Sequence, residues 1–202
     1  LYAKPGYDAV TDLVPVARLT SIPNVLLVHP SVPAKTLRQF VNLARAQPGK
    51  LNFGTGGAGT TNHLANELLK HLEKINIVHV PYKGSAQSTP ALLAGQIQVL
   101  FSLLAPVAPH AKAGKLRVLA VAASERSPQA PDIPTFAELG VKDMVFVPTV
   151  SALVTAGTPR PIIAKLGTEI AKAARHPDSL KRFEGLAIDV VANNPDEYGA
   201  QL

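Results

Sequence analysis

Residues 51–64 read LNFGTGGAGTTNHL and combine three kinds of local structure in one short stretch. Residues 51–53 have strand-forming side chains, a glycine-rich turn follows them, and an apolar helical periodicity begins at Thr61. A glycine-rich turn that leads into a helix presents backbone N–H groups at the helix N-terminus, where a negative charge is stabilised. The stretch therefore predicts a strand, a turn and a helix that together hold an anion.

The same alternation of strands and helices continues after residue 73. We expect a strand at 75–80, a second turn with the sequence PYKGSAQS at 81–88, a helix at 89–93, a strand at 97–101, a loop at Ser102, a helical turn ending at Lys112 and a strand at 116–123. Strands that alternate with short helices predict an α/β fold with a largely parallel sheet. In such sheets a ligand binds at the ends of the strands, where the chain passes from each strand into the next helix.

The flanking segments predict further elements. Residues 14–28 read as extended chain punctuated by prolines, and residues 33–47 read as a helix with one apolar face. Further along we expect a surface loop at 124–134, a short helix at 136–139, a strand at 145–154, helices at 158–174 and 178–183, a strand at 187–191 and a last helix with Asn194 as its N-cap.

The composition narrows the classes of function. The chain has 202 residues, of which 47% are hydrophobic, so it can form one large or two small domains. Its net charge is +6, yet the basic residues are scattered singly apart from Lys181 and Arg182, which argues against a nucleic-acid surface. The absence of cysteine excludes disulfides, a thiolate nucleophile and a cysteine-based zinc site. The apolar runs are far shorter than the ~18 residues of a spanning helix.

A nucleotide site is the first hypothesis for the glycine-rich turn. Gly54, Gly56 and Gly59 satisfy the dinucleotide-binding pattern G-x-G-x-x-G. The acidic residue that should end the next strand is missing, because that strand ends in HVP at residues 79–81, although Lys83 could meet a 2′-phosphate. An NADP-binding oxidoreductase domain therefore stays as an alternative. A P-loop is rejected, because Thr60 stands where its lysine should be.

A carboxylate cradle is the second hypothesis. Backbone N–H groups of residues 56–61 and the hydroxyls of Thr55, Thr60 and Thr61 can converge on one or two oxygens at the helix N-terminus. The simpler alternative is a tight turn in which a threonine caps the helix. Three glycines in six residues exceed what capping needs.

Hydrolytic and metal chemistry have weaker support. Ser85 and Ser102 have His63 and His79 nearby in the sequence, with Asp132 farther on, but no G-x-S-x-G elbow is present. The sequence also lacks an H-x-x-x-H pair and a turn with paired carboxylates. We therefore expect neither a catalytic triad nor a metal site.

Four longer runs carry a family resemblance. They read GTGGAGTTNHLANELL at 54–69, VHVPYKGSAQSTPALLAGQIQVLF at 78–101, KAGKLRVLAVAASERSPQAPDIPTFAELGV at 112–141 and AGTPRPIIAKLGTEIAKA at 156–173. Together, and in the order PYKG, GKLR, PDIPT and GTP, they resemble the extracytoplasmic solute-binding proteins of the tripartite tricarboxylate transporter family, the Bug or TctC-like proteins. The resemblance covers nearly the whole chain.

The resemblance implies an α/β fold of the type II periplasmic-binding-protein class, with two lobes joined by crossing strands. Members of this family close two lobes on a small carboxylate and are not enzymes, so no cofactor is expected. On this basis residues 1–22 correspond to the remnant of lobe one and a crossing strand, residues 23–125 to lobe two, and residues 126–202 to a crossing segment and the C-terminal part of lobe one. The first lobe is then incomplete, and the chain resembles a family member shortened at both ends.

The resemblance also implies a set of ligand-binding residues. The glycine-rich turn and the second turn correspond to ligand loops of lobe two, a third loop lies near Ser102, and His63 is placed early enough in its helix to reach the ligand. The expected ligand-binding residues are Thr55, Gly56, Gly57, Ala58, Gly59, Thr60, Thr61, His63, Lys83, Gly84, Ser85 and Ser102. The acidic residue that the family usually has after the strand ending at Phe101 is absent, because the sequence there reads LFSLLAP.

The resemblance finally implies partners and a location. The expected ligand is a di- or tricarboxylate, an amino acid or an aromatic acid, which is delivered to membrane transporter subunits from the periplasm; a ligand-sensing receptor module is a further alternative. A signal peptide is not part of the given sequence, which begins at Leu1. A lobe without its partner should bind carboxylates weakly, and its uncovered apolar faces favour fragment association or domain exchange.

Overall fold

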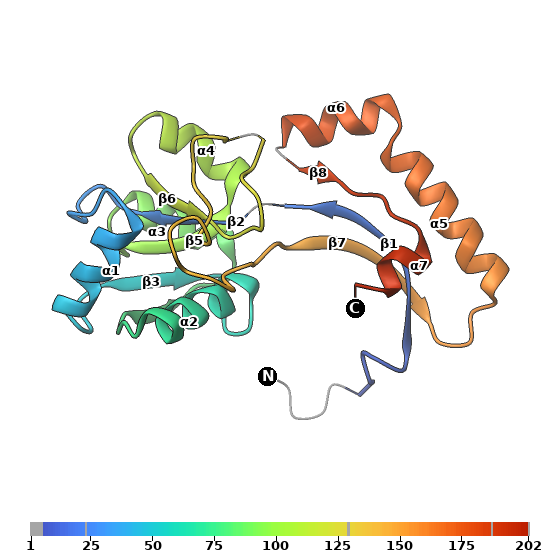
Figure 1. Cartoon of the computed structure of the whole chain (residues 1–202), viewed down its shortest axis with the longest axis horizontal. Coiled ribbons are helices and arrows are strands. Elements are labelled where there is room, and N and C mark those ends of the chain that lie inside the picture. The colour runs from blue at the N-terminus through green and yellow to red at the C-terminus, as the bar shows by residue number, and fades with distance from the viewer. Residues whose placement is uncertain (1–5, 23, 129, 187, 202) are drawn as a thin grey trace. The chain divides into compact units, whose positions relative to one another are not determined.

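The computed structural model describes residues 6–22, 24–128, 130–186 and 188–201. The chain divides into two compact units. Unit 1 comprises Leu1–Ile22 and Pro148–Leu202, and unit 2 comprises Pro23–Val147. The chain therefore starts in unit 1, passes into unit 2 and returns, which gives each unit its own sheet (Figure 1).

Unit 2 is built on a five-stranded sheet with the order β4-β3-β5-β2-β6. Its strands are β2 (Asn24–Val28), β3 (Asn52–Thr55), β4 (Val78–Pro81), β5 (Val99–Leu103) and β6 (Arg117–Val121). Strand β3 is parallel to β4 and β5, whereas β2 is antiparallel to β5 and β6. The predicted α/β fold is confirmed, but the sheet is mixed and not largely parallel. The expectation was wrong because an apolar strand pattern does not encode strand direction.

Both faces of this sheet are covered by helices. Helices α1 (Leu37–Ala46) and α2 (Thr61–Glu73) pack into one buried cluster, and α3 (Ser85–Leu93) and α4 (Leu104–Lys112) pack into the other (Figure 1). Strand β2 shows how one sequence serves two cores, since Leu26 and Val28 enter the first cluster and Val25 and Leu27 enter the second. Successive side chains of a strand point to opposite faces, so a fully apolar strand implies burial on both sides.

Several predicted boundaries need correction. Helix α1 begins at Leu37, with Thr36 as its N-cap, and not at Pro33. Helix α3 begins at Ser85 and not at Thr89, so part of the predicted turn is its first turn. Ser102 lies inside β5 and not in a loop, and residues 136–139 form turns in place of a helix. A single glycine or serine does not reveal whether a helix starts before or after it.

The described residues of 124–147, which belong to unit 2, form no helix or strand. Phe136 lies against Phe101, with ring centroids 5.9 Å apart, and Val141 and Met144 enter the same buried cluster. Backbone hydrogen bonds tie the segment to β6 and to the residue after it, as in the bond from the Phe136 N–H to the Val121 carbonyl. The compact unit thus extends to Val147, beyond residue 125, where the sequence expectation placed its end.

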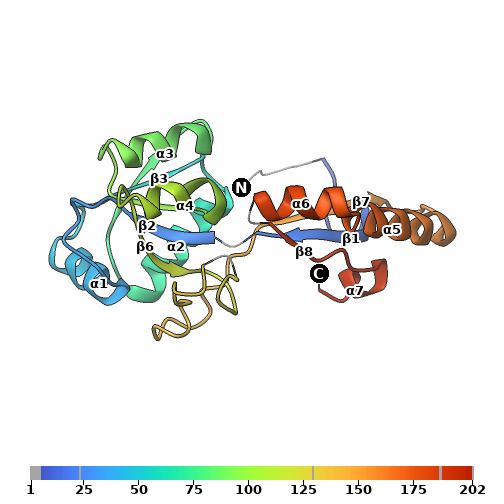
Figure 2. The ribbon, with the colours of Figure 1, turned by 90° about the horizontal axis from the view of Figure 1, so that it is seen from above.

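Unit 1 has a smaller, antiparallel sheet. Its strands β1 (Leu13–Ser21), β7 (Thr149–Thr155) and β8 (Asp189–Val190) have the order β7-β1-β8. Helices α5 (Arg160–Ala174), α6 (Pro177–Gly185) and α7 (Pro195–Gly199) complete the unit (Figure 2). The prediction that Asn194 caps the last helix is confirmed, and Glu197 completes a capping box with it.

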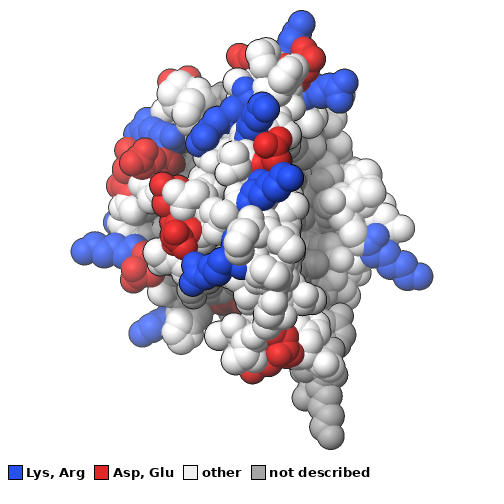
Figure 3. All heavy atoms as spheres, turned by 90° about the vertical axis from the view of Figure 1, so that its right-hand side faces the viewer, with Lys and Arg blue, Asp and Glu red and all other residues white. Residues whose placement is uncertain are grey.

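Charged side chains are mixed over the face drawn in Figure 3, where Lys and Arg alternate with Asp and Glu. This distribution agrees with the scattered basic residues of the sequence and differs from the continuous basic stripe of a nucleic-acid surface. In the described part of the chain, no helix has the length and apolar character needed to cross a membrane.

Candidate ligand-binding site

The glycine turn, residues 55–60, connects β3 to α2 and is held by its own threonines. Thr60 is the N-cap of α2, and its Oγ1 accepts a hydrogen bond from the His63 N–H at 3.4 Å. The same hydroxyl donates to the Gly57 carbonyl at 2.8 Å, while Thr55 Oγ1 accepts the Gly57 N–H at 3.2 Å. The capping prediction is therefore confirmed, and these hydrogen bonds define the conformation of the turn.

The four glycines at positions 54–59 meet three different physical requirements. Gly57 and Gly59 have φ of 124° and 81°, which residues with a Cβ rarely adopt. Gly56 is needed for close approach, because a Cβ there would lie 3.3 Å from both Gly84 Cα and the Ser85 nitrogen. Gly54 belongs to β3, and a Cβ on it would collide with the side chain of Ile97.

A second turn, residues 82–85, lies directly beside the glycine turn. The Tyr82 N–H donates to the Thr55 carbonyl at 2.9 Å, and the Gly84 N–H donates to the Gly56 carbonyl at 3.2 Å. Helix α3 begins at Ser85, and its N-cap Gly84 has no side chain to cap the free N–H groups. Two helix N-termini, each with a positive dipole end, therefore meet at the carboxyl edge of parallel strands β3 and β4.

Backbone donors remain free at both helix N-termini. Among the described residues, the N–H groups of Ala58, Thr61 and Asn62 donate to no protein acceptor, and the same holds for those of Ser85 and Ala86. The first N–H groups of a helix have no intrahelical partner and are satisfied by caps, water or a ligand. These five groups can therefore bind carboxylate oxygens without any positively charged side chain.

The other expected ligand-binding residues have different surroundings. Lys83 is exposed, and its ammonium forms no ion pair with a described residue. Ser102 is 4% exposed and pairs with Val25 across the sheet, and its hydroxyl has no hydrogen bond to either turn in the described ranges. The structure thus brings together residues 55–61 and 83–85, while Ser102 lies near the carboxyl end of neighbouring strand β5.

Three asparagines that the sequence analysis did not single out belong to this edge of the sheet. Asn24 begins β2, which runs opposite to β5, so its side chain lies opposite Leu103 at the same edge. Its Nδ2 donates to Asn62 Oδ1 at 3.4 Å, and Asn66 Nδ2 donates to the Asn62 carbonyl at 2.8 Å. The buried Oδ1 atoms of Asn24 and Asn66 have no described partner, a situation that ordered water usually resolves. The sequence does not show that β2 is antiparallel to β5, and this direction places Asn24 at the edge of the sheet where the two turns lie.

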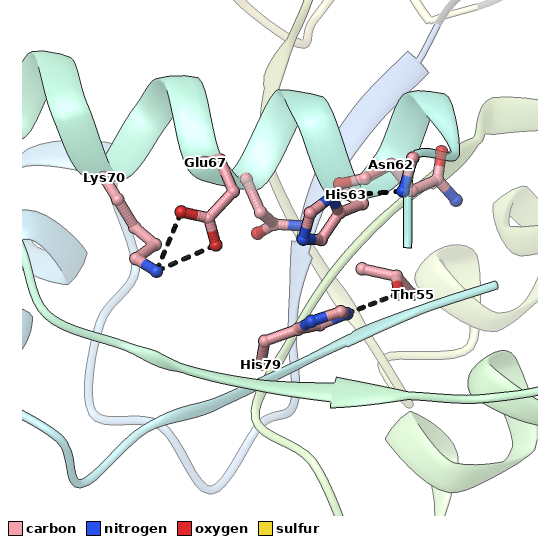
Figure 4. A network of polar contacts seen from close by, with 8 residues as sticks. Thr55, Asn62, His63, Glu67, Lys70 and His79 are labelled. Carbon is pink, nitrogen blue, oxygen red and sulfur yellow. Dashed lines mark hydrogen bonds and ion pairs between the residues drawn. The ribbon is translucent and has the colours of Figure 1, made fainter. Parts of the chain in front are cut away.

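Two histidine rings lie beneath the glycine turn (Figure 4). His79 of β4 contacts Thr55 Oγ1 through Nε2 at 2.6 Å and stacks on Phe53 with centroids 4.9 Å apart. His63 of α2 lies 4.5 Å from the His79 ring, and its Nδ1 accepts the Gly59 N–H at 3.3 Å. Burial lowers the pKa of His79 below its ordinary value of 6.5, and the neighbouring His63 lowers it further. His79 is therefore neutral at neutral pH.

Clustered metal ligands are missing from the described ranges, since no three His, Asp or Glu residues lie close enough to share an ion. What the site offers is a set of backbone N–H groups and hydroxyls at two helix N-termini. Such donors recognise the oxygens of an anion and provide no nucleophile or general base of their own.

An α/β unit with ligand loops at the carboxyl ends of its strands, joined by two chain passages to a second α/β unit, defines the class of type II periplasmic solute-binding proteins. Structures of this class match the chain closely. Rpa4515 of R. palustris, solved with adipate, is 30% identical, with a TM-score of 0.86 over 100% of this chain and 67% of that one. MatC (Rpa3494) from Rhodopseudomonas palustris, with bound malate, is 31% identical, with a TM-score of 0.82 over 94% of this chain and 65% of that one.

The chain belongs to the TctC family, the tripartite tricarboxylate transporter family receptors, whose family model matches residues 1–201. Protein BugT of Bordetella pertussis is 31% identical over 95% of this chain and 59% of its own length. A UPF0065 protein from the tcbD-tcbE intergenic region of Pseudomonas sp. strain P51 is 32% identical over 96% of this chain and 58% of its own length. The chain thus spans less than two thirds of these curated relatives.

Proposed function

We propose that the chain is part of a periplasmic solute-binding protein that captures a small carboxylate and delivers it to a tripartite tricarboxylate-type transporter. The observation that carries this proposal is the pair of adjoining helix N-termini, at which five backbone N–H groups have no described protein acceptor. The adipate and malate bound to two related structures are ligands of the same chemistry. In this proposal Thr55–Thr61, Lys83–Ser85, His63 and Ser102 form the wall of the site that unit 2 contributes.

The binding free energy that this wall can provide by itself is limited. Hydrogen bonds to a charged group contribute about 1.5–3 kcal/mol each, and a helix dipole adds up to about 1 kcal/mol, before ordering and association costs are subtracted. Micromolar affinity needs about 8 kcal/mol net. A second wall that excludes water is therefore part of the proposal, and we expect the given chain to bind carboxylates less tightly than its longer relatives.

The NADP-binding alternative has less support. In a dinucleotide-binding turn the first glycine makes the tight bend itself, whereas Gly54 lies inside β3, where packing against Ile97 requires it. Strand β4 ends at Pro81, which cannot bond a ribose hydroxyl through a side chain. The periplasmic location and the transporter partner rest on the family alone, and a sensing role would use the same ligand-induced closure.

Calorimetric and thermal-shift titrations test the proposal directly. The chain, and a version extended at its N-terminus, are titrated with adipate, malate, citrate, succinate, glutamate, nicotinate and NADP. We expect one carboxylate to stabilise the extended form, with a weaker effect on the given chain. Stabilisation by NADP alone would show that the glycine turn is a nucleotide site.

A matched pair of glycine variants sharpens the test. Gly59→Ala and Gly140→Ala each place a Cβ on a residue with similar positive φ, 81° and 88°, within unit 2. Both should lose about 1–2 kcal/mol of stability through backbone strain. Only Gly59→Ala should also abolish carboxylate binding, because only Gly59 belongs to the turn that presents the donors.

A further inference from the structure

The contacts of Thr55 connect the glycine turn to the partly buried ring of His79. Its side chain is inaccessible to solvent, and its Oγ1 has three neighbours: the Gly57 N–H at 3.2 Å, the Gly57 carbonyl at 3.3 Å and His79 Nε2 at 2.6 Å. A hydroxyl has one proton and two lone pairs. If His79 Nε2 carries a proton, it donates to Oγ1, and Oγ1 is free to donate to the Gly57 carbonyl. All three contacts are then satisfied at once.

The second ring holds the other side of the turn. His63 Nδ1 accepts the Gly59 N–H, so the two imidazoles fix the residues on both sides of Ala58, whose own N–H is a free donor. A nitrogen that accepts a hydrogen bond must be unprotonated, and an imidazolium has no free acceptor nitrogen. The Gly59 N–H therefore has its acceptor in the unprotonated Nδ1 of His63.

We propose that His79 is a positioning residue of the carboxylate site, which acts through Thr55 to keep the glycine turn in its donor-presenting conformation. This inference rests on the proposed carboxylate function. It adds a residue that contacts no ligand in the proposal.

The charged groups around His79 come from one helix. Glu67 favours the protonated ring, whereas His63 and Lys70 oppose it, and Lys70 is itself paired with Glu67 at 2.8 Å (Figure 4). On the strand side the ring faces Phe53 and Thr55 of β3, neither of which is ionised at these pH values, and β4 is the edge strand of its sheet. Burial is the largest influence, so the neutral ring is favoured overall.

The sign of the resulting pH dependence follows from the lowered pKa of His79. The unfolded chain binds this proton more tightly than the folded chain. The contribution of His79 to the stability of the folded chain is therefore fully present above about pH 6.5, and it is lost as the pH falls through the lowered pKa of the folded state. The hydrogen bond to Thr55 does not change with this protonation, because the added proton joins Nδ1 and leaves the Nε2–H in place.

The first experiment needs no ligand. Amide spectra of the ligand-free, isotope-labelled chain are recorded from about pH 8 to about pH 5, which brackets histidine titration. We expect the Gly57 amide resonance to shift with the titration of His79 in the unmodified chain. His79→Gln keeps a donor to Thr55 but does not titrate, so the Gly57 shift should vanish in it. His71→Gln, on an exposed part of α2, is the matched control and should change nothing.

The second experiment measures adipate affinity by calorimetry between about pH 8 and about pH 6, above the range in which carboxylates protonate. At the upper limit His79→Gln should bind within about threefold of the unmodified chain, and His79→Leu about five- to tenfold more weakly, which corresponds to one lost hydrogen bond. The ratio of the affinities of the unmodified chain and His79→Gln should stay the same at both limits, because neutral and protonated imidazole both carry the Nε2–H that Thr55 accepts.

The outcomes separate the two proposals. A Gly57 resonance that titrates equally in the unmodified chain and in His79→Gln overturns the positioning role, as does a His79→Leu variant that binds adipate as tightly as the unmodified chain. If the Gly57 response depends on His79 but no carboxylate binds even to the N-terminally extended form, the positioning of the turn stands and the proposed function fails. If His79→Leu does not fold, the spectra of His79→Gln alone decide the matter.

Discussion

The two units of the chain differ in how completely they bury their apolar residues. Unit 2 has helices on both faces of its sheet, and Phe40, Phe53 and Phe101 are inaccessible to solvent. Unit 1 has a three-stranded sheet and few buried apolar side chains, namely Val16, Ala17, Ile22, Ile163, Ala174, Ala192 and Tyr198 among the described residues. Side chains such as Val150, Leu153 and Ile162 are about half exposed there.

The two turns of the candidate site thus belong to the better packed unit. Hydrophobic burial is the main favourable term in folding, so unit 2 should provide most of the stability of the chain. A rigid scaffold keeps the backbone donors of a binding site in place, which lowers the ordering cost when a ligand arrives. The binding turns can therefore have a fixed shape even if unit 1 is only weakly stable.

The largest expected effect comes from comparing a fully buried residue of unit 2 with a half-exposed residue of unit 1. Phe101→Ala in unit 2 removes a buried ring and should lower the free energy of unfolding by about 3–5 kcal/mol. Ile162→Ala on α5 of unit 1, where the side chain is 50% exposed, should change it by less than about 0.5 kcal/mol. Urea unfolding measures both. Equal losses would show that unit 1 is packed more tightly than its exposed residues indicate.

The next effect tests why Gly54 is a glycine. Gly54→Ala forces a Cβ against the buried Ile97 side chain and should cost about 1–3 kcal/mol, as overpacking does. Ile97→Val removes the Cδ1 atom that collides, so the double variant should lose less than the sum of the two single changes. A double-mutant cycle from thermal unfolding gives the coupling. Strict additivity would mean that Gly54 is required for another reason, such as ligand contact.

A smaller effect concerns the cap of α2. Thr60→Val removes the hydroxyl that accepts the His63 N–H and donates to the Gly57 carbonyl, and it should cost about 1 kcal/mol. Thr60→Ser retains the hydroxyl and serves as the control. Thermal melts at neutral pH compare the two. Identical melting temperatures for both variants would show that the turn does not depend on its cap.

The smallest effect lies in unit 1 and has the opposite pH dependence to that of His79. Burial raises the pKa of the Asp189 carboxyl above 3.8, so the folded chain holds this proton more tightly than the unfolded chain. The associated stability is present below that value and is lost as pH rises through the raised pKa. Asp189→Asn should therefore stabilise the chain slightly at neutral pH and have no such effect at about pH 3. A gain that is the same at both pH values would contradict this account.

The sequence predicted the elements of unit 2 better than their arrangement. The apolar periodicity of residues 37–44 gave the buried face of α1, since Leu37, Phe40, Val41 and Ala44 are all buried. In α2 the same reasoning gave Ala65 and Leu69 correctly, but Leu64 is 43% exposed. Periodicity identifies the side of a helix that faces a core, and the width of the buried stripe depends on the neighbouring elements.

The candidate site shows the same limit. The glycine turn, its Thr60 cap and the start of α2 were predicted from consecutive residues. Asn24 was missed because it is 38 residues from Asn62, and the role of His79 was missed because it is 24 residues from Thr55. A residue inside a strand gives no local signal that a turn on the adjacent strand depends on it.

Local sequence was thus sufficient for the strand–turn–helix unit, for the caps of α2 and α7 and for the family of this chain. The unit and the caps depend on steric rules and hydrogen bonds between residues close in sequence. The direction of β2, the contact between the glycine turn and the second turn, and the contact between the His63 and His79 rings required the tertiary structure. Their physical basis is the order in which strands pair, which is decided by the packing of the whole sheet between two layers of helices.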